Sequence, residues 1–176
     1  DFLPSFNLTY SPVNRTNIRI AGSRTVARPE FREIAPFTFF DFETIASTAG
    51  TPDLKRSSIL NADVRFEWYP KAGEVISVAA FYKQFTDPIE LRLNSGSVAT
   101  RRQYEFQNAV SADLYGTEFE IRKNLSFLSK SSEWLERFFL SGNVSVIFSE
   151  VLLGNTDPSG NPLPATIRPL QGQSPY

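Results

Sequence analysis

Residues 59–85, ILNADVRFEWYPKAGEVISVAAFYKQF, decide the fold of this chain. In the first half, apolar and charged side chains alternate: Val64, Phe66 and Trp68 take one side, and Asp63, Arg65 and Glu67 take the other. A period of two residues predicts a half-buried β-strand. The second half repeats the pattern, with an apolar set made of Ile76, Val78, Ala80 and Tyr82. The stretch therefore predicts two strands that each present one apolar face.

The residues between these two runs predict a tight hairpin. If Lys71, Ala72 and Gly73 form a three-residue loop with Gly73 in the left-handed conformation, Pro70 lies opposite Glu74. That register pairs Trp68 with Ile76, Phe66 with Val78 and Val64 with Ala80. All three pairs are apolar, so one face of the hairpin is apolar along its length.

The predicted strands are longer than those of ordinary globular proteins. Each runs for about 12 residues, or roughly 40 Å at about 3.3 Å per residue, whereas globular strands have about 5 to 6 residues. Tilted by about 45°, such a strand rises about 28 Å, which is close to the hydrocarbon thickness of a bilayer. The strand length therefore favours a transmembrane β-barrel.

Similar alternating runs recur along the chain. They are SFNLTY (5–10), TNIRIAGS (16–23), DLYGTEFEIRK (113–123) and FFLSGNVSVIFS (138–149). The connections alternate in length: 11–15 and 71–73 are short, 124–137 is intermediate with a short helix expected around 132–137, and 27–58, 87–110 and 151–173 are long. Short turns on one rim and long loops on the other are typical of a membrane barrel, so we expect an all-β antiparallel meander of about eight long strands.

Two of the long connections carry signals of their own. Residues 89–95 (IELRLNS) and 99–106 (ATRRQYEF) predict a hairpin within the second connection. In the first connection, Pro29 ends regular pairing because proline cannot donate to a ladder. The charges around it are expected at the polar rim on a short helical turn, with Phe31 and Phe37 packing the loop down; these charges are Arg28, Glu30, Arg32 and Glu33.

Composition excludes several classes of function. The formal net charge of -1, from 18 basic and 19 acidic residues, provides no long-range field for nucleic acid. The absence of His and Cys removes thiol chemistry, disulfides, Ser-His-Asp triads and nearly all zinc sites, although carboxylates could still hold a hard cation. The sequence contains no run of about 18 apolar residues, so it predicts no transmembrane helix. We expect no enzymatic activity, no cofactor and no metal site.

An ordered set of segments resembles a known family. RTVARPEFREIAPF (24–37), NADVRFEWYP (61–70) with GEVISVAAFYKQFTDPIE (73–90), DLYGTEFEIRKNL (113–125) and RPLQGQSPY (168–176) look like the distal barrel part of TonB-dependent outer-membrane receptors of Gram-negative bacteria. The likeness extends from about residue 3 to residue 176. Each segment alone is a modest pattern, but the ordered set is specific.

The resemblance implies a function as well as a fold. It implies a 22-stranded transmembrane β-barrel in the bacterial outer membrane, with an N-terminal plug, that takes up a scarce nutrient using energy passed on by TonB. Residues 1–176 would be part of one barrel domain, without the plug and the final strands. The expected partners are membrane lipid, a small nutrient ligand and, through the plug, TonB. A siderophore, cobalamin, an oligosaccharide and a peptide all remain open as the ligand.

Two loop segments are candidates for ligand contact. FTFFDFE (37–43) places Phe39, Phe40 and Asp41 in what could be an aromatic platform on the outer face. Arg101 and Arg102 precede further aromatic residues and could clamp an anionic or sugar ligand by stacking and hydrogen bonding. Aromatic residues that pack a long loop onto the barrel, and an ordinary charged hairpin, are the simpler explanations.

Two other functions fit parts of the pattern. Glu118 and Glu120 lie two residues apart, about 6.5 to 7 Å between their Cα atoms, which suits a glycosidase or a calcium site but equally a polar lumen wall. A soluble β-sandwich that binds carbohydrate would pack the same apolar faces together. The barrel hypothesis instead predicts lipid exposure of the faces that carry Phe66, Trp68, Val78, Val144 and Val146.

Overall fold

The computed structural model describes residues 2–43, 45–94, 102–128, 134–154, 156 and 167–173. Regular structure is almost entirely β, as expected. The chain forms two compact units: residues 1–23, 61–83 and 114–148 make the first, and 24–60, 84–113 and 149–176 make the second. Within the described part of the chain, no helix is long and apolar enough to cross a membrane.

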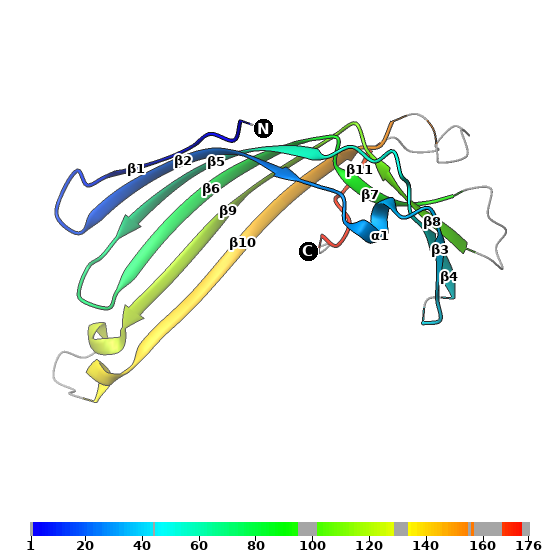
Figure 1. The fold of residues 1–176 in the computed structure, drawn as a ribbon. Coiled ribbons are helices and arrows are strands. Elements are labelled where there is room, and N and C mark those ends of the chain that lie inside the picture. Colours follow the sequence, from blue (N-terminus) through cyan, green and yellow to red (C-terminus); the bar gives the residue numbers. More distant parts are fainter. Residues whose placement is uncertain are drawn as a thin grey trace. The chain divides into compact units, whose positions relative to one another are not determined.

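Seven strands form a sheet whose order follows the chain (Figure 1). From edge to edge they are β1 (Ser5–Tyr10), β2 (Thr16–Ala27), β5 (Ser57–Trp68), β6 (Val75–Thr86), β9 (Ser111–Asn124), β10 (Phe139–Leu152) and β11 (Ile167–Arg168). Each long strand therefore lies beside the next long strand, which confirms the expected meander. The five strands β2, β5, β6, β9 and β10 are 12 to 14 residues long, and β5 and β6 have the dozen residues each that the hairpin pattern predicts.

The period of two gives this sheet two different faces. In the antiparallel β1–β2 ladder, Leu8 lies opposite Ile20 and Tyr10 opposite Ile18, whereas Thr9 lies opposite Arg19. Residues directly opposite each other share a face. The hydrophobic pairs therefore gather on one face and the polar pair lies on the other.

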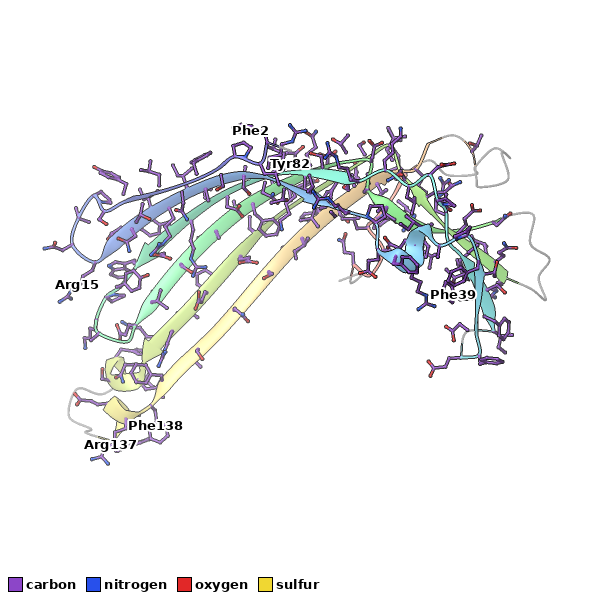
Figure 2. All side chains as sticks on the ribbon, viewed as in Figure 1. Phe2, Arg15, Phe39, Tyr82, Arg137 and Phe138 are labelled. Atoms are coloured by element: carbon purple, nitrogen blue, oxygen red, sulfur yellow. The ribbon has the colours of Figure 1, made fainter. Side chains whose placement is uncertain are left out.

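The apolar face of the long strands is exposed. Phe66 and Trp68 on β5 are each 45% exposed, and Val144 on β10 is 63% exposed; Val78 and Val146 are similarly open. Side chains project from both faces of the strands (Figure 2). A soluble β-sandwich would bury these residues against a second sheet, and the structure places none of the five in a core. Exposure of this face is what a lipid-facing wall requires.

The buried apolar core is correspondingly small. Among the described residues, six apolar residues are buried, and three of them, Ala109, Ala112 and Val151 in the second unit, form a cluster against which Phe85, Leu153 and Leu170 pack. Much of what is buried elsewhere is polar, including Glu67, Glu74 and Glu90. Such a distribution reverses that of a soluble domain, whose interior is apolar.

The connections differ in length as predicted. Gly73 adopts the left-handed conformation with a φ of 79°, and Glu74 N donates to Lys71 O at 3.1 Å. The strands end at Trp68 and begin again at Val75, so the connection is longer than the three residues expected; the β5–β6 register stays a prediction. The β9–β10 connection holds two 3₁₀ helices, η1 (Leu125–Phe127) and η2 (Leu135–Arg137). The second lies within the helix expected around 132–137, whose first residues fall outside the described ranges.

The second unit contains a further sheet of four short strands. Its order is β3 (Thr38–Asp41), β4 (Ala46–Ala49), β8 (Arg102–Asn108) and β7 (Ile89–Leu93). The antiparallel β7–β8 pair confirms the hairpin expected between 87 and 110. Strands β3 and β4 lie in a segment expected to be a long loop, and the β4–β8 pair is parallel, which departs from a purely antiparallel fold.

A short helix precedes this sheet. Helix α1 (Phe31–Ile34) begins after Glu30, whose backbone N donates to Glu33 Oε2 at 2.8 Å, so the expected helical turn is confirmed. The prediction that Phe31 packs the loop down is wrong, because that side chain is 80% exposed. Phe37 is also exposed, at 48%, and the centre of its ring lies 4.4 Å from that of Phe39 in the same segment.

Candidate functional site

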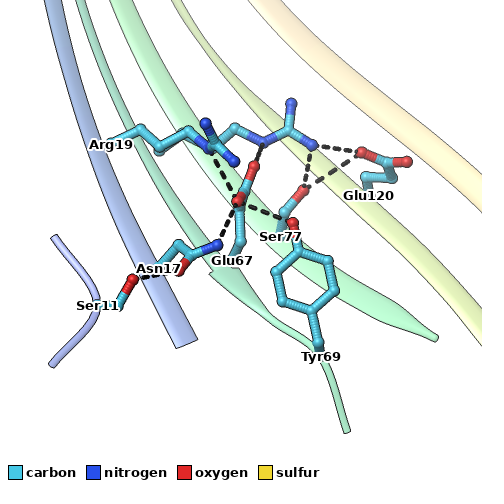
Figure 3. A network of polar contacts seen from close by, with 8 residues as sticks. Ser11, Asn17, Arg19, Glu67, Tyr69, Ser77 and Glu120 are labelled. Atoms are coloured by element: carbon cyan, nitrogen blue, oxygen red, sulfur yellow. Dashed lines mark hydrogen bonds and ion pairs between the residues drawn. The ribbon is translucent and has the colours of Figure 1, made fainter. Parts of the chain in front are cut away.

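The polar face of the first unit carries a continuous charged network (Figure 3). Arg19 on β2 and Arg65 on β5 both bind Glu67, with Arg19 Nε 3.0 Å from Glu67 Oε2 and Arg65 Nε 3.1 Å from Glu67 Oε1. Arg65 Nη2 also lies 2.6 Å from Glu120 Oε2 on β9. We call Arg19, Arg65, Glu67 and Glu120 the wall network. It crosses the sheet because alternation puts these side chains on one face of β2, β5 and β9, with Ser77 of the intervening β6 bonded to both Arg65 and Glu120.

Glu67 is the centre of the wall network. It is 6% exposed and accepts further hydrogen bonds from Tyr69 Oη at 2.9 Å and Asn17 Nδ2 at 3.4 Å. Burial, together with the hydrogen bond to Glu67, raises the pKa of Tyr69 above its ordinary value of 10.0. Tyr69 therefore remains a neutral donor. These contacts fix the position of the Glu67 carboxylate on the polar face.

The two carboxylates that suggested catalysis belong to this face. Glu120 is paired with Arg65 and lies 3.4 Å from Ser77 Oγ, whereas Glu118 is exposed. They line a cavity of about 210 Å³ together with Ser77, Asn143 and Ser145. Among the described residues, no group of three or more acidic side chains could hold a metal ion. The arrangement matches a polar wall, the simpler of the two interpretations of this pair.

A second polar cluster joins the β5–β6 and β9–β10 connections. Lys123 Nζ lies 2.7 Å from Glu74 Oε2, and Asn124 N donates to Glu74 Oε1 at 3.2 Å. Asn124 Nδ2 in turn donates to Glu136 O at 2.6 Å. The hydrogen bond from Lys123 holds the pKa of Glu74 below its ordinary value of 4.5, although desolvation acts in the opposite direction. Sequence reasoning missed this cluster because its members lie about 50 residues apart.

The four-stranded sheet brings most of the predicted ligand residues into one region. Asp41 is in register with Ala46, which is in register with Arg102, so Asp41 and Arg102 lie two strands apart on one face. Phe39 is on the same face and is in register, through Thr48, with Tyr104. The Arg32 guanidinium lies 4.6 Å from the centre of the Phe39 ring. This face therefore combines aromatic rings with both signs of charge.

Two of the five predicted residues are not brought to that face. Phe40 alternates to the opposite side of β3, is 51% exposed and contacts the Phe42 ring edge-to-face at 4.9 Å. Arg101 lies outside the described residues. Phe39, Asp41 and Arg102 are thus the predicted candidates that share a surface, and we call them, with Tyr104, the sheet platform.

The face of β7 opposite the sheet platform carries charged residues that the sequence analysis did not identify. Arg92 is 7% exposed and donates to Gln107 Oε1 at 2.7 Å, to Leu153 O at 3.1 Å and to Thr156 O at 2.8 Å. Glu90, which is 6% exposed, forms an ion pair with Arg168. These bonds attach the segment after β10 to the small sheet. The alternation of IELRL was the available signal, since it puts Glu90 and Arg92 on one side.

Comparison with known proteins connects these faces to a family. The family described as TonB dependent receptor-like, beta-barrel, matches residues 1–173. No curated protein matches the chain. The siderophore receptor PirA from Pseudomonas aeruginosa has a similar structure, with a TM-score of 0.61 and 13% identity over 86% of this chain and 30% of that receptor. A variant of the ferric enterobactin receptor PfeA from the same species gives a TM-score of 0.57 and 16% identity over 86% of this chain and 25% of that receptor.

The two kinds of comparison carry different weight. At 13% and 16% identity, the structural likeness shows the fold, and the chain spans less than a third of either receptor. The family match covers nearly the whole chain. This family comprises receptors and transporters of the bacterial outer membrane rather than a class of enzymes. The chain belongs to the TonB-dependent receptor family, in whose outer-membrane β-barrel its strands form part of the wall.

Proposed function

We propose that this chain supplies wall strands and extracellular loops to a receptor that takes up a scarce nutrient with energy delivered by TonB. The observation that carries this proposal is the two-faced sheet. Its apolar face leaves Phe66 and Val144 exposed, and its opposite face holds the buried carboxylate of Glu67 between two arginines. Lipid on one side and a polar lumen on the other would account for both faces.

The same proposal makes residues 1–176 part of one barrel domain within a longer receptor, coupled to TonB through an N-terminal plug. Two observations support it. The chain covers 30% of PirA and 25% of the PfeA variant. In addition, β1 is the edge of the long sheet, and at the other edge the described residues of β10 and β11 pair at Val151 and Leu152. In hydrocarbon, open strand edges must pair with further strands.

A ferric siderophore is the first ligand to test among the four classes. The structural neighbours are a siderophore receptor and a ferric enterobactin receptor. The sheet platform offers the ring of Phe39 and the charges of Asp41 and Arg102 on one face of the four-stranded sheet. Aromatic and cationic groups together can stack on and neutralise a flat anionic chelate.

The test is uptake and binding by the full-length receptor. We expect cells that express it to accumulate one of four labelled ligands, a ferric siderophore, cobalamin, an oligosaccharide or a peptide, only when TonB is present. Arg102→Gln with Phe39→Ala should weaken binding of that ligand about tenfold or more. Lys55→Gln is the control, because it removes an exposed charge that lies outside the sheet platform and whose backbone, at N and O, bonds to Asn108. Uptake that continues unchanged without TonB would contradict the proposed function.

A further inference from the structure

We propose that the rim formed by the two short connections and the intermediate β9–β10 connection binds the headgroups of anionic phospholipids. This inference rests on the proposed membrane-spanning wall and adds a specific lipid partner to it. The surface, which we call the turn rim, consists of Arg15, Lys71, Trp134, Arg137 and Phe138, all in the first unit.

Each of these three connections contributes an exposed cation to the turn rim. Arg15 lies between β1 and β2, Lys71 between β5 and β6, and Arg137 between β9 and β10. Figure 2 shows Arg15 and Arg137 at the turn ends of their strands. Arg15 Nη1 donates to Pro70 O at 2.7 Å, and Tyr69 N donates to Arg15 O at 2.8 Å. The first two connections are therefore held together, with Arg15 next to the segment that carries Lys71.

Acidic residues do not balance these cations at the described part of the rim. Glu74 is buried and is neutralised by Lys123, which leaves Glu136 as the exposed acid among the described residues of the three connections. Three exposed cations against one exposed acid give the rim a positive charge. A guanidinium binds phosphate through two parallel hydrogen bonds, so the rim is complementary to a phosphodiester headgroup.

Exposed aromatic side chains accompany the charge. Trp134 is 62% exposed and Phe138 is 53% exposed, and their rings meet edge-to-face at 5.6 Å. Phe138 precedes Leu140, Val144 and Val146 at even spacing, so it continues the apolar face of β10 to its end. Trp at such a position favours the membrane interface, where its ring meets lipid and its N–H meets water.

Continuity with the apolar face decides between a lipid and a protein partner. A soluble partner bound at Trp134 and Phe138 would have to displace the lipid that covers Leu140 and Val144 next to them. A phospholipid instead places acyl chains on the apolar face and its phosphate beside Arg137 at the same time. Zwitterionic lipids would satisfy the aromatic residues equally, and the cations would select for anionic ones.

The experiment measures lipids that remain bound to the full-length receptor. Receptor in detergent is titrated with phosphatidylglycerol or phosphatidylethanolamine, and bound lipid is counted by native mass spectrometry. We expect phosphatidylglycerol to be retained preferentially. Arg137→Gln should lower its apparent affinity about fivefold, the amount expected for one cation near a membrane surface. Lys71→Gln should act in the same direction.

Lys55→Gln is the matched control, because it removes one exposed cation from a long connection instead of the rim. Equal retention of both lipids by the native receptor, or an equal loss in Arg137→Gln and Lys55→Gln, would overturn the inference. Nutrient uptake by the Arg137→Gln receptor is measured in parallel and should be unchanged. Uptake without lipid selectivity refutes the rim site alone, whereas lipid selectivity without TonB-dependent uptake refutes the proposed function alone.

Discussion

At the scale of single residues, the carboxylate of Glu74 makes the free energy of unfolding depend on pH in the acid range. Its pKa is lowered in the folded chain by the hydrogen bond from Lys123. The stabilisation is therefore complete above the ordinary pKa of 4.5 and is lost as the pH falls through the lower folded value. We expect Glu74→Gln to lower the free energy of unfolding at pH 7 by about 1 to 3 kcal/mol, as for other hydrogen bonds to charged groups.

The measurement is unfolding of the refolded full-length receptor in denaturant at a series of pH values. The difference between the native receptor and Glu74→Gln should shrink as the pH drops below 4.5. Glu136→Gln is the control, because Glu136 is an exposed acid in the β9–β10 connection. Its backbone carbonyl, and not its carboxylate, accepts the hydrogen bond from Asn124. A difference that stays constant down to low pH would show that the carboxylate charge of Glu74 is not what stabilises this corner.

Individual site residues could be predicted from the sequence only in part. Alternation around Arg65 and Glu67 identifies the face they occupy, and that face is where the structure places them. It does not identify their partners, because Arg19 and Glu120 reach them only through strand order and register. The same holds for Asp41 and Arg102, which share a row only because β4 and β8 pair in parallel across more than 50 residues of chain.

At the scale of the strands, Gly116 on β9 allows close packing within the sheet. A Cβ atom at Gly116 would lie 2.5 Å from Val146 O and 2.8 Å from Phe81 Cζ. We expect Gly116→Val to destabilise the folded receptor by about 1 to 3 kcal/mol, since the backbone of β10 cannot move away cheaply. Denaturant unfolding of the refolded receptor measures this difference.

Gly142 on β10 provides a matched comparison for Gly116. A Cβ atom there meets nothing within 4 Å, and valine favours extended backbone. Gly142→Val should therefore leave stability unchanged or raise it slightly. Equal destabilisation by the two substitutions would mean that strand conformation, rather than contact with Phe81 and Val146, requires glycine at position 116.

Elements with a sustained alternating pattern were predictable, and the four-residue strands were not. Strands β5 and β6 follow from a period of two sustained over a dozen residues each. Strands β3 and β4 have four residues each, which is too short for alternation to distinguish them from a loop, and the pairing partner of β4 is distant in sequence. Residue patterns thus indicate the wall and the β7–β8 hairpin, whereas β3 and β4 depend on contacts that no local pattern contains.

At the scale of the whole molecule, the central claim is that the two faces of the long sheet meet different solvents. Strand β10 tests it best, because consecutive residues on both of its faces are exposed: Asn143, Val144, Ser145 and Val146. The claim places Val144 and Val146 in lipid and Asn143 and Ser145 in the lumen. The chain contains no cysteine, so single-cysteine variants at these four positions can be spin-labelled with no competing thiol in this segment.

The decisive measurement is the collision rate of these four labels with oxygen, which concentrates in lipid, and with a water-soluble nickel chelate, in the full-length receptor reconstituted in a bilayer. The account predicts that the oxygen signal is high at Val144→Cys and Val146→Cys, and that the nickel signal is high at Asn143→Cys and Ser145→Cys. Equal access to both reagents at all four positions, or alternation in the opposite phase, would contradict it.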